Sequence, residues 1–164
     1  GMVLMCQPIF DCIESIKSEK SIVIMMTPDG EKYTEKRAKD LTKYKHIILL
    51  CGHYEGFDER IKTIVDLEIS IGDFILTGGE IPAMAITDSI VRLLDGVINK
   101  ESLESESFEN NLLDYPVYTK PSNFRGLLVP EILLSGNHQK IKEWRKQKQI
   151  EKTKNKRNDI MGDL

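Results

Sequence analysis

Short runs of apolar residues alternate with amphipathic stretches along the first hundred residues of the chain. Three runs are rich in β-branched residues and too short for helices, which predicts buried strands at 21–26, 46–52 and 67–72. Helices are predicted beside them at 7–18, 34–42 and 57–65. Short apolar strands that alternate with helices are typical of a parallel α/β sheet covered by helices on both faces.

Glycine-bearing turns follow the predicted strands at TPDG (27–30), CGHYEG (51–56) and IGDFILTGGEIP (71–82). The last contains a strand-like run, 74–79, that ends on two glycines and restarts as a helix with Pro82 in its first turn. In a parallel sheet such turns gather at the carboxyl edge, where ligands bind. Each turn alone is explained by tight packing, but the three together predict a site whose backbone groups recognise a flat polar ligand such as adenine. No GxGxxG or GxxxxGK[ST] motif is present.

The second half of the chain is less regular. A helix is predicted after the double glycine, with apolar residues at Met84, Ile86, Ile90, Val91 and Leu94 and an end at Asp95-Gly96. Residues 97–128 predict a long loop, because they are acidic at first and then carry prolines. A turn at 135–137 then starts a basic helix that runs to about 156.

The net charge of −3 conceals an asymmetry. Residues 140–157 contain nine Lys or Arg residues and two Glu residues, whereas 101–114 contain five acids and no base. A basic run is typical either of a solvated helix face or of a surface that binds phosphate, and the residues alone leave both open.

Three cysteines without CxxC spacing and three scattered histidines favour buried reduced thiols over disulfides or a zinc site. The chain has no apolar run long enough to span a bilayer and no signal-peptide pattern at its start. We therefore expect a cytoplasmic protein without a membrane partner.

Four long stretches resemble the bacterial tRNA (guanine-N1)-methyltransferase family of the SPOUT class. They are LLCGHYEGFDERI (49–61), SIGDFILTGGEIPAMAITDSIVRLLDGVI (70–98), ESFENNLLDYPVYTKP (106–121) and VPEILLSGNHQKIKEWR (129–145). The resemblance implies a SPOUT-type parallel α/β sheet with helices on both faces and a deep trefoil knot, followed by a basic C-terminal helix. It implies three parts: a methyltransferase domain at 1–98, a flexible linker at 99–128 and the start of a tRNA-binding helical domain at 129–164.

The resemblance also implies that S-adenosylmethionine is bound in the knot, mainly by backbone groups of the three glycine turns. The matching residues are Met25, Met26 and Pro28 in the first loop, Gly52, Tyr54 and Glu55 in the second, and Ile71, Gly72, Leu76, Gly78, Gly79 and Pro82 in the third. Family members tend to have Tyr and Leu in place of Met25 and Met26, and Arg in place of His53. The last change removes a fixed positive charge near the site.

The implied reaction methylates N1 of the guanine immediately 3′ of the anticodon in tRNA. A general base must remove the N1 proton and a cation should stabilise charge that develops on O6. The matching positions are Glu106, where the family usually has Asp, and Arg92; Glu55 and Asp58 are alternative bases. From residues alone, a solvated acid in an acidic loop is the favoured interpretation of Glu106, and Arg92 is also explained as a helix partner of Asp88. The family's magnesium requirement is a further expectation, although no metal-ligand spacing is visible.

The resemblance implies tRNA as partner and a homodimer with a substrate site shared between subunits. Arg145, Lys146 and Lys148 are the predicted RNA contacts, and Trp144 is predicted to pack rather than stack on a base. The match lacks the family's N-terminal segment, stops near the start of the C-terminal domain, and leaves open whether Gly1 is native. A catalytically inactive RNA-binding module and another SPOUT RNA methyltransferase remain the alternatives.

Overall fold

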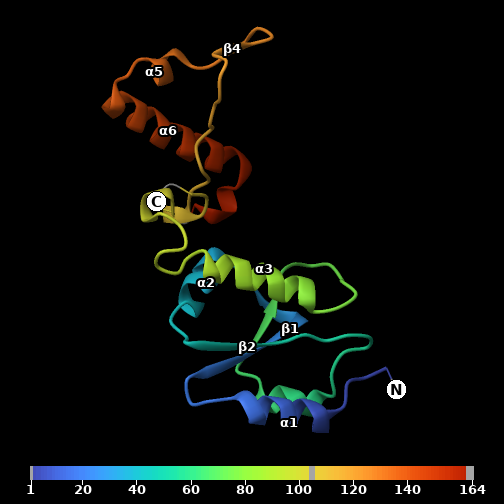
Figure 1. Ribbon diagram of the computed structural model, residues 1–164. Helices are drawn as coiled ribbons and strands as arrows, with labels where there is room; N and C mark the ends of the chain where they lie inside the picture. The colour runs from blue at the N-terminus through green and yellow to red at the C-terminus, as the bar shows by residue number, and fades with distance from the viewer. Residues whose placement is uncertain (1, 104–105, 162–164) are drawn as a thin grey trace. The chain divides into compact units, whose positions relative to one another are not determined.

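The computed structural model describes residues 2–103 and 106–161, so Gly1 and the last three residues lie outside the described part. The chain divides into two compact units, one ending at Ile98 and the other beginning at Asn99 (Figure 1). The predicted linker and terminal-domain boundaries remain predictions.

The first unit is built on a parallel three-stranded sheet in the order β2-β1-β3. Its strands are β1 (Ser21–Lys32), β2 (His46–Leu50) and β3 (Leu67–Ser70). Ile24 of the central strand pairs with Leu49 on one side and with Leu67 on the other. Because β1 is covered on both faces, its residues from Ile22 to Met26 are all buried, which explains the continuous apolar run.

Helices cover both faces of this sheet, as the sequence predicted (Figure 1). Residues of α2 (Glu35–Leu41) and α3 (Glu80–Val91) pack on one face, against Ile22, Ile24 and Met26. The opposite face packs against α1 (Cys6–Ile16) and the end of the 3-10 helix η1 (Glu59–Ile64). The α/β architecture is therefore confirmed.

Local signals set several helix boundaries. The Thr34 hydroxyl accepts a hydrogen bond from the Arg37 backbone N–H at 3.4 Å, which caps α2 as the sequence predicted. The helix predicted near 57–65 is only the 3-10 helix η1, which the Asp58 carboxylate caps. In α3, Ile86 and Ile90 are buried as core residues, whereas Met84 and Val91 are exposed, and Leu94 is exposed beyond the end of the helix.

Two sequence expectations about strands and turns are wrong. TPDG at 27–30 is not a turn that ends a strand, because β1 continues past it and pairs again with β3 from Glu31. The run at 74–79 is not a strand, since Phe74 and Ile75 are exposed and lie in an irregular loop. In both places the local composition does not decide whether a strand forms. Pairing with a neighbouring strand decides it.

The second unit is organised around the long helix α6, which Asn137 caps by accepting from the Lys140 backbone N–H at 3.1 Å. The buried Thr153 hydroxyl donates to the Gln149 carbonyl at 2.6 Å and accepts from the Leu113 N–H at 2.8 Å, which fixes the 112–114 segment to α6. The elements are α4 (Lys100–Leu103), η2 (Glu109–Asn111), β4 (Asn123–Phe124), β5 (Leu127–Leu128), α5 (Glu131–Leu134), α6 (His138–Lys156) and η3 (Asn158–Ile160).

The cysteine expectation is corrected in part, because Cys12 is exposed while Cys6 and Cys51 are half-buried. All three are free thiols. Of the helices in the described part of the chain, none combines the length and apolar character that crossing a bilayer requires.

Candidate functional site

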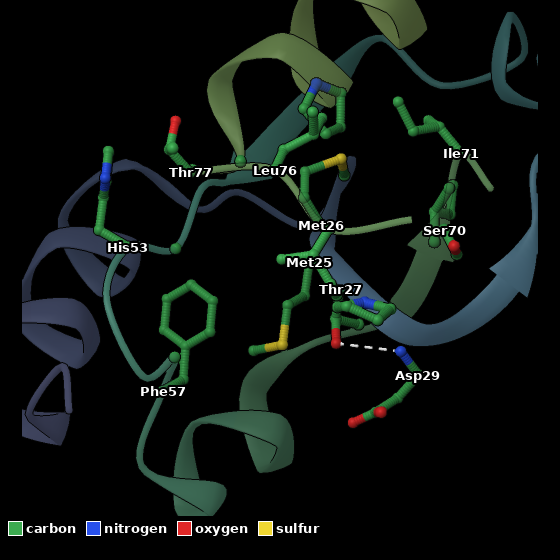
Figure 2. A pocket seen from close by; sticks show the side chains of 18 of the residues that line it. Met25, Met26, Thr27, Asp29, His53, Phe57, Ser70, Ile71, Leu76 and Thr77 are labelled. Carbon is green, nitrogen blue, oxygen red and sulfur yellow. Dashed lines mark hydrogen bonds between the residues drawn. The ribbon is translucent and has the colours of Figure 1, made fainter. Parts of the chain in front are cut away.

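The first unit contains a cavity of about 490 Å³ beside the interruption in β1 and the carboxyl ends of β2 and β3 (Figure 2). Three separate chain segments line it: the middle of β1 and the stretches that follow β2 and β3. Every residue that the sequence predicts to hold a cofactor lines this one cavity: Met25, Met26, Pro28, Gly52, Tyr54, Glu55, Ile71, Gly72, Leu76, Gly78, Gly79 and Pro82. A volume of this size is typical of small-molecule sites.

The first wall is the segment 27–30, which bulges out of the central strand. Met26 and Glu31 both pair with Ile69, so the four residues between them have no strand partner in β3. The Asp29 N–H bonds to the Thr27 hydroxyl at 3.3 Å (Figure 2). A Cβ at Gly30 would collide with the backbone of Ile69, so only glycine allows the strand to re-pair this closely. The bulge therefore leaves backbone groups beside the cavity without ladder partners.

The second wall is the loop 52–57, which the N-terminal segment supports. The Leu4 N–H donates to the Gly56 carbonyl at 2.8 Å, and the Leu4 carbonyl accepts from the Asp58 N–H at 3.0 Å. The Phe57 ring lies against Gly52, where an added Cβ would come within 2.6 Å of it. Sequence reasoning missed both the role of Phe57 and this pairing, because neither has a periodic signal.

The third wall holds the double glycine, and the geometry explains it. The Gly79 N–H donates to the Gly52 carbonyl at 2.9 Å. A Cβ on Gly79 would lie 2.7 Å from Cys51 Cα and 2.9 Å from the Gly52 nitrogen. Its neighbour Gly78 forms an isolated antiparallel bridge with His53. The start of α3 can therefore lie directly on the end of β2 only because these positions lack side chains.

Acidic groups outnumber basic groups around the cavity. Asp29, Glu55 and Glu59 line it. Among its described lining residues, Lys62 is the one lysine, and there is no arginine. The Lys62 ammonium lies 3.2 Å from Glu59 and 3.5 Å from Asp29, and the bond to Glu59 raises the pKa of Lys62. The cavity is therefore suited to a ligand that carries positive charge.

His53 and Glu80 form a contact at the rim of the cavity. His53 Nε2 is paired with the Glu80 carboxylate, and this hydrogen bond lowers the pKa of Glu80. Glu80 is the first residue of α3, where the helix dipole also favours a negative charge. His53, the position where the resemblance leads one to expect arginine, therefore has a carboxylate partner in this chain.

The two predicted catalytic residues do not line the cavity. Arg92 is half-buried and follows the C-terminal end of α3, whereas the cavity lies at the N-terminal end of that helix. Glu106 is half-buried and belongs to the second unit. Their roles remain predictions.

Asp58, an alternative base, is poorly suited to accept a proton. Its carboxylate takes two hydrogen bonds from the Arg60 guanidinium, at 2.9 and 2.7 Å, and one from the Arg60 backbone N–H at 3.0 Å. These bonds hold the pKa of Asp58 far below its usual range. Of the two alternatives, Glu55 is therefore the better candidate, since it lines the cavity.

The predicted RNA contacts lie together on α6. The Arg145 guanidinium is 4.6 Å from the centre of the Tyr115 ring, and Lys148 pairs with Glu151 at 2.7 Å. Lys146 is exposed, and Trp144 is half-buried. Within the described ranges, no group of three His, Cys, Asp or Glu residues is arranged to hold a metal ion.

Comparison with known proteins gives consistent matches along the chain. The model of the family described as tRNA (Guanine-1)-methyltransferase TrmD matches residues 1–163. A tRNA (guanine-N(1)-)-methyltransferase of Malacoplasma penetrans is 60% identical over 160 residues, which cover 98% of this chain and 71% of that protein. Proteins of the same name from Mycoplasma genitalium and Bacillus pumilus are 52% and 51% identical, with 98% of this chain covered and 69% and 68% of theirs.

Proposed function

The chain belongs to the tRNA (guanine-1)-methyltransferase family, and we propose that it methylates N1 of the guanine immediately 3′ of the anticodon in tRNA. The observation that carries the proposal is the single cavity lined by three glycine-bearing segments. A non-catalytic RNA-binding module is not favoured, because relatives at 51 to 60% identity carry the enzyme's name. A different RNA target is disfavoured by the same names.

S-adenosylmethionine is the proposed methyl donor, and the residues present fit it. When bound, it supplies an electrophilic methyl group on a sulfonium centre, and its overall charge at neutral pH is positive. The carboxylates of Asp29, Glu55 and Glu59 complement that charge. Backbone groups of the bulge at 27–30 and of the turn at Gly78 and Gly79 would hold the adenine, consistent with a site where side-chain identity matters little.

The proposed chemistry uses one base and one cation. The Glu106 carboxylate would accept the guanine N1 proton as N1 takes the methyl group that the bound cofactor would supply, with the cofactor's thioether as the leaving group. The Arg92 guanidinium would stabilise negative charge that develops on O6. A dependence on magnesium and the trefoil knot both remain predictions.

We propose tRNA as the partner of α6, with Arg145, Lys146 and Lys148 contributing positive charge. Clustered lysines and arginines release counterions when they bind phosphate, so affinity should fall steeply with salt. A tRNA substrate also argues for the cytoplasm as the working location.

Titration of S-adenosylhomocysteine into the protein tests the cofactor proposal. We expect calorimetry to detect one site per chain, because all three walls of the cavity come from one chain. ATP, which has the same adenosine but a strongly negative tail, should bind far more weakly to this acidic cavity. A folded protein that binds neither compound, or binds both equally, would contradict the proposal.

The homodimer proposal is supported by a second apolar stripe on α3. Ala83, Ile86 and Ile90 bury one side of the helix, while Ile81, Met84 and Val91 lie exposed on the opposite side. A helix that is apolar on two opposite sides is typical of one that packs against a different partner on each side. A second copy of the chain is the proposed cover.

We expect sedimentation at micromolar concentration to give twice the 18.8 kDa chain mass. Met84→Glu should shift the protein to monomer, because it would bury a charge in the apolar contact. Met5→Glu is the matched control, since Met5 is 71% exposed and Met84 63% exposed in the same unit. A wild-type monomer would remove the basis for a shared substrate site.

A further inference from the structure

The second unit contains a groove of about 690 Å³ that is separate from the cofactor cavity. One wall is the extended segment 115–122, and the other is formed by residues of α5 and α6 with Val129. Leu133 and Ile141 provide apolar surface in it.

The charges that line the groove are all positive. Lys120 and Arg145 line it, and no Asp or Glu is among its described lining residues. The guanidinium of Arg145 is held 4.6 Å from the Tyr115 ring centre, so one cation is fixed on the groove wall by an aromatic face. This charge pattern suits a ligand with phosphate groups in a chain whose net charge is negative.

Aromatic side chains accompany these cations without being buried. Tyr118 lines the groove and is 47% exposed. The β4-β5 hairpin rises from the same rim, where the Val129 N–H donates to the Ser122 carbonyl at 2.9 Å. On this hairpin Phe124 is 56% exposed, and the Arg125 guanidinium lies 5.2 Å from its ring centre.

We propose that this groove binds an unpaired nucleotide of the RNA substrate. The base stacks on Tyr118 over the apolar floor, and Lys120 and Arg145 contact the adjoining phosphates. Exposed aromatic faces beside cations are how proteins hold single-stranded nucleic acid, because every base offers a flat face. The proposal rests on the proposed function only for its choice of RNA as the ligand.

The test is fluorescence anisotropy with a labelled 12-nucleotide single-stranded RNA, repeated with the same strand in a blunt duplex. We expect the protein to bind the single strand more tightly than the duplex. Tyr118→Ala should weaken that binding by about tenfold, whereas Tyr118→Phe retains it, because stacking does not need the hydroxyl. Tyr44→Ala is the matched control, since Tyr44 is 46% exposed in the first unit.

The outcomes separate the groove from the cofactor site. Equal affinities for Tyr118→Ala and Tyr44→Ala would overturn the groove proposal, as would equal binding of duplex and single strand. Titration of S-adenosylhomocysteine into the same variants judges the cofactor cavity independently. If Tyr118→Ala binds S-adenosylhomocysteine normally and its RNA affinity is unchanged, only the groove proposal is rejected. If the wild-type protein binds no S-adenosylhomocysteine, the proposed function is contradicted.

Discussion

Glu106→Gln abolishes methyl transfer to tRNA while leaving S-adenosylhomocysteine binding unchanged, if Glu106 is the general base. Glutamine keeps the shape of the side chain but cannot accept the N1 proton, so turnover should fall by about 10² to 10⁴-fold. Cofactor affinity should not change, since Glu106 is not among the residues that line the cavity. Single-turnover methylation with radiolabelled cofactor, together with calorimetry, measures the two effects separately.

Glu109→Gln is the matched control, because it makes the same change three residues along the same segment and should leave turnover intact. Glu106→Asp should also retain activity, because it restores the family's usual residue. Undiminished turnover in Glu106→Gln would contradict its role as the base and make Glu55 the better candidate. Asp58 is disfavoured as a proton acceptor because its bonds from Arg60 lower its pKa.

Gly79→Ala is expected to damage the cofactor cavity itself. Its Cβ would lie 2.7 Å from Cys51 Cα, and because that contact is with backbone, β2 and α3 must move apart. Overpacking of this kind costs about 1–3 kcal/mol. We expect S-adenosylhomocysteine binding at least about tenfold weaker, which corresponds to about 1.4 kcal/mol.

Gly96→Ala separates this effect from a general loss of stability. Gly96 has a φ of +85° and open space around it, so alanine there is strained without colliding with anything. It should lower the thermal midpoint while cofactor affinity stays at the wild-type value. Equal affinity of Gly79→Ala and wild type would contradict the assignment of this turn to the cofactor.

The three glycine turns could be predicted as one site because strand direction alone brings them together. In a parallel sheet, turns that follow neighbouring strands are expected at the same edge, and the structure places two of these segments after β2 and β3 and the first in the bulge within β1. The identity of the ligand, in contrast, came from resemblance. No feature of the residues distinguishes a methyl donor from another adenosine compound until the carboxylates of Asp29, Glu55 and Glu59 are seen around one cavity.

The errors share a physical cause. TPDG has the composition of a turn, yet the strand resumes because Glu31 and Lys32 pair with Ile69 and Ser70 of β3. Residues 74–76 have the composition of a strand, yet they pair with no strand of the described sheet, and Phe74 and Ile75 are exposed. Strand formation is decided by long-range pairing, which local composition does not contain.

The link between Leu4 and the loop 52–57 joins the ligand site to the chain's first helix. Leu4 bonds to both Gly56 and Asp58, and α1 begins only two residues later. A ligand that orders this loop would thereby also slow the opening of the N-terminal segment and the first turn of α1. By reciprocity, whatever frays residues 2–4 weakens ligand binding by the same free energy, so amide exchange at this remote end would report occupancy of the cavity.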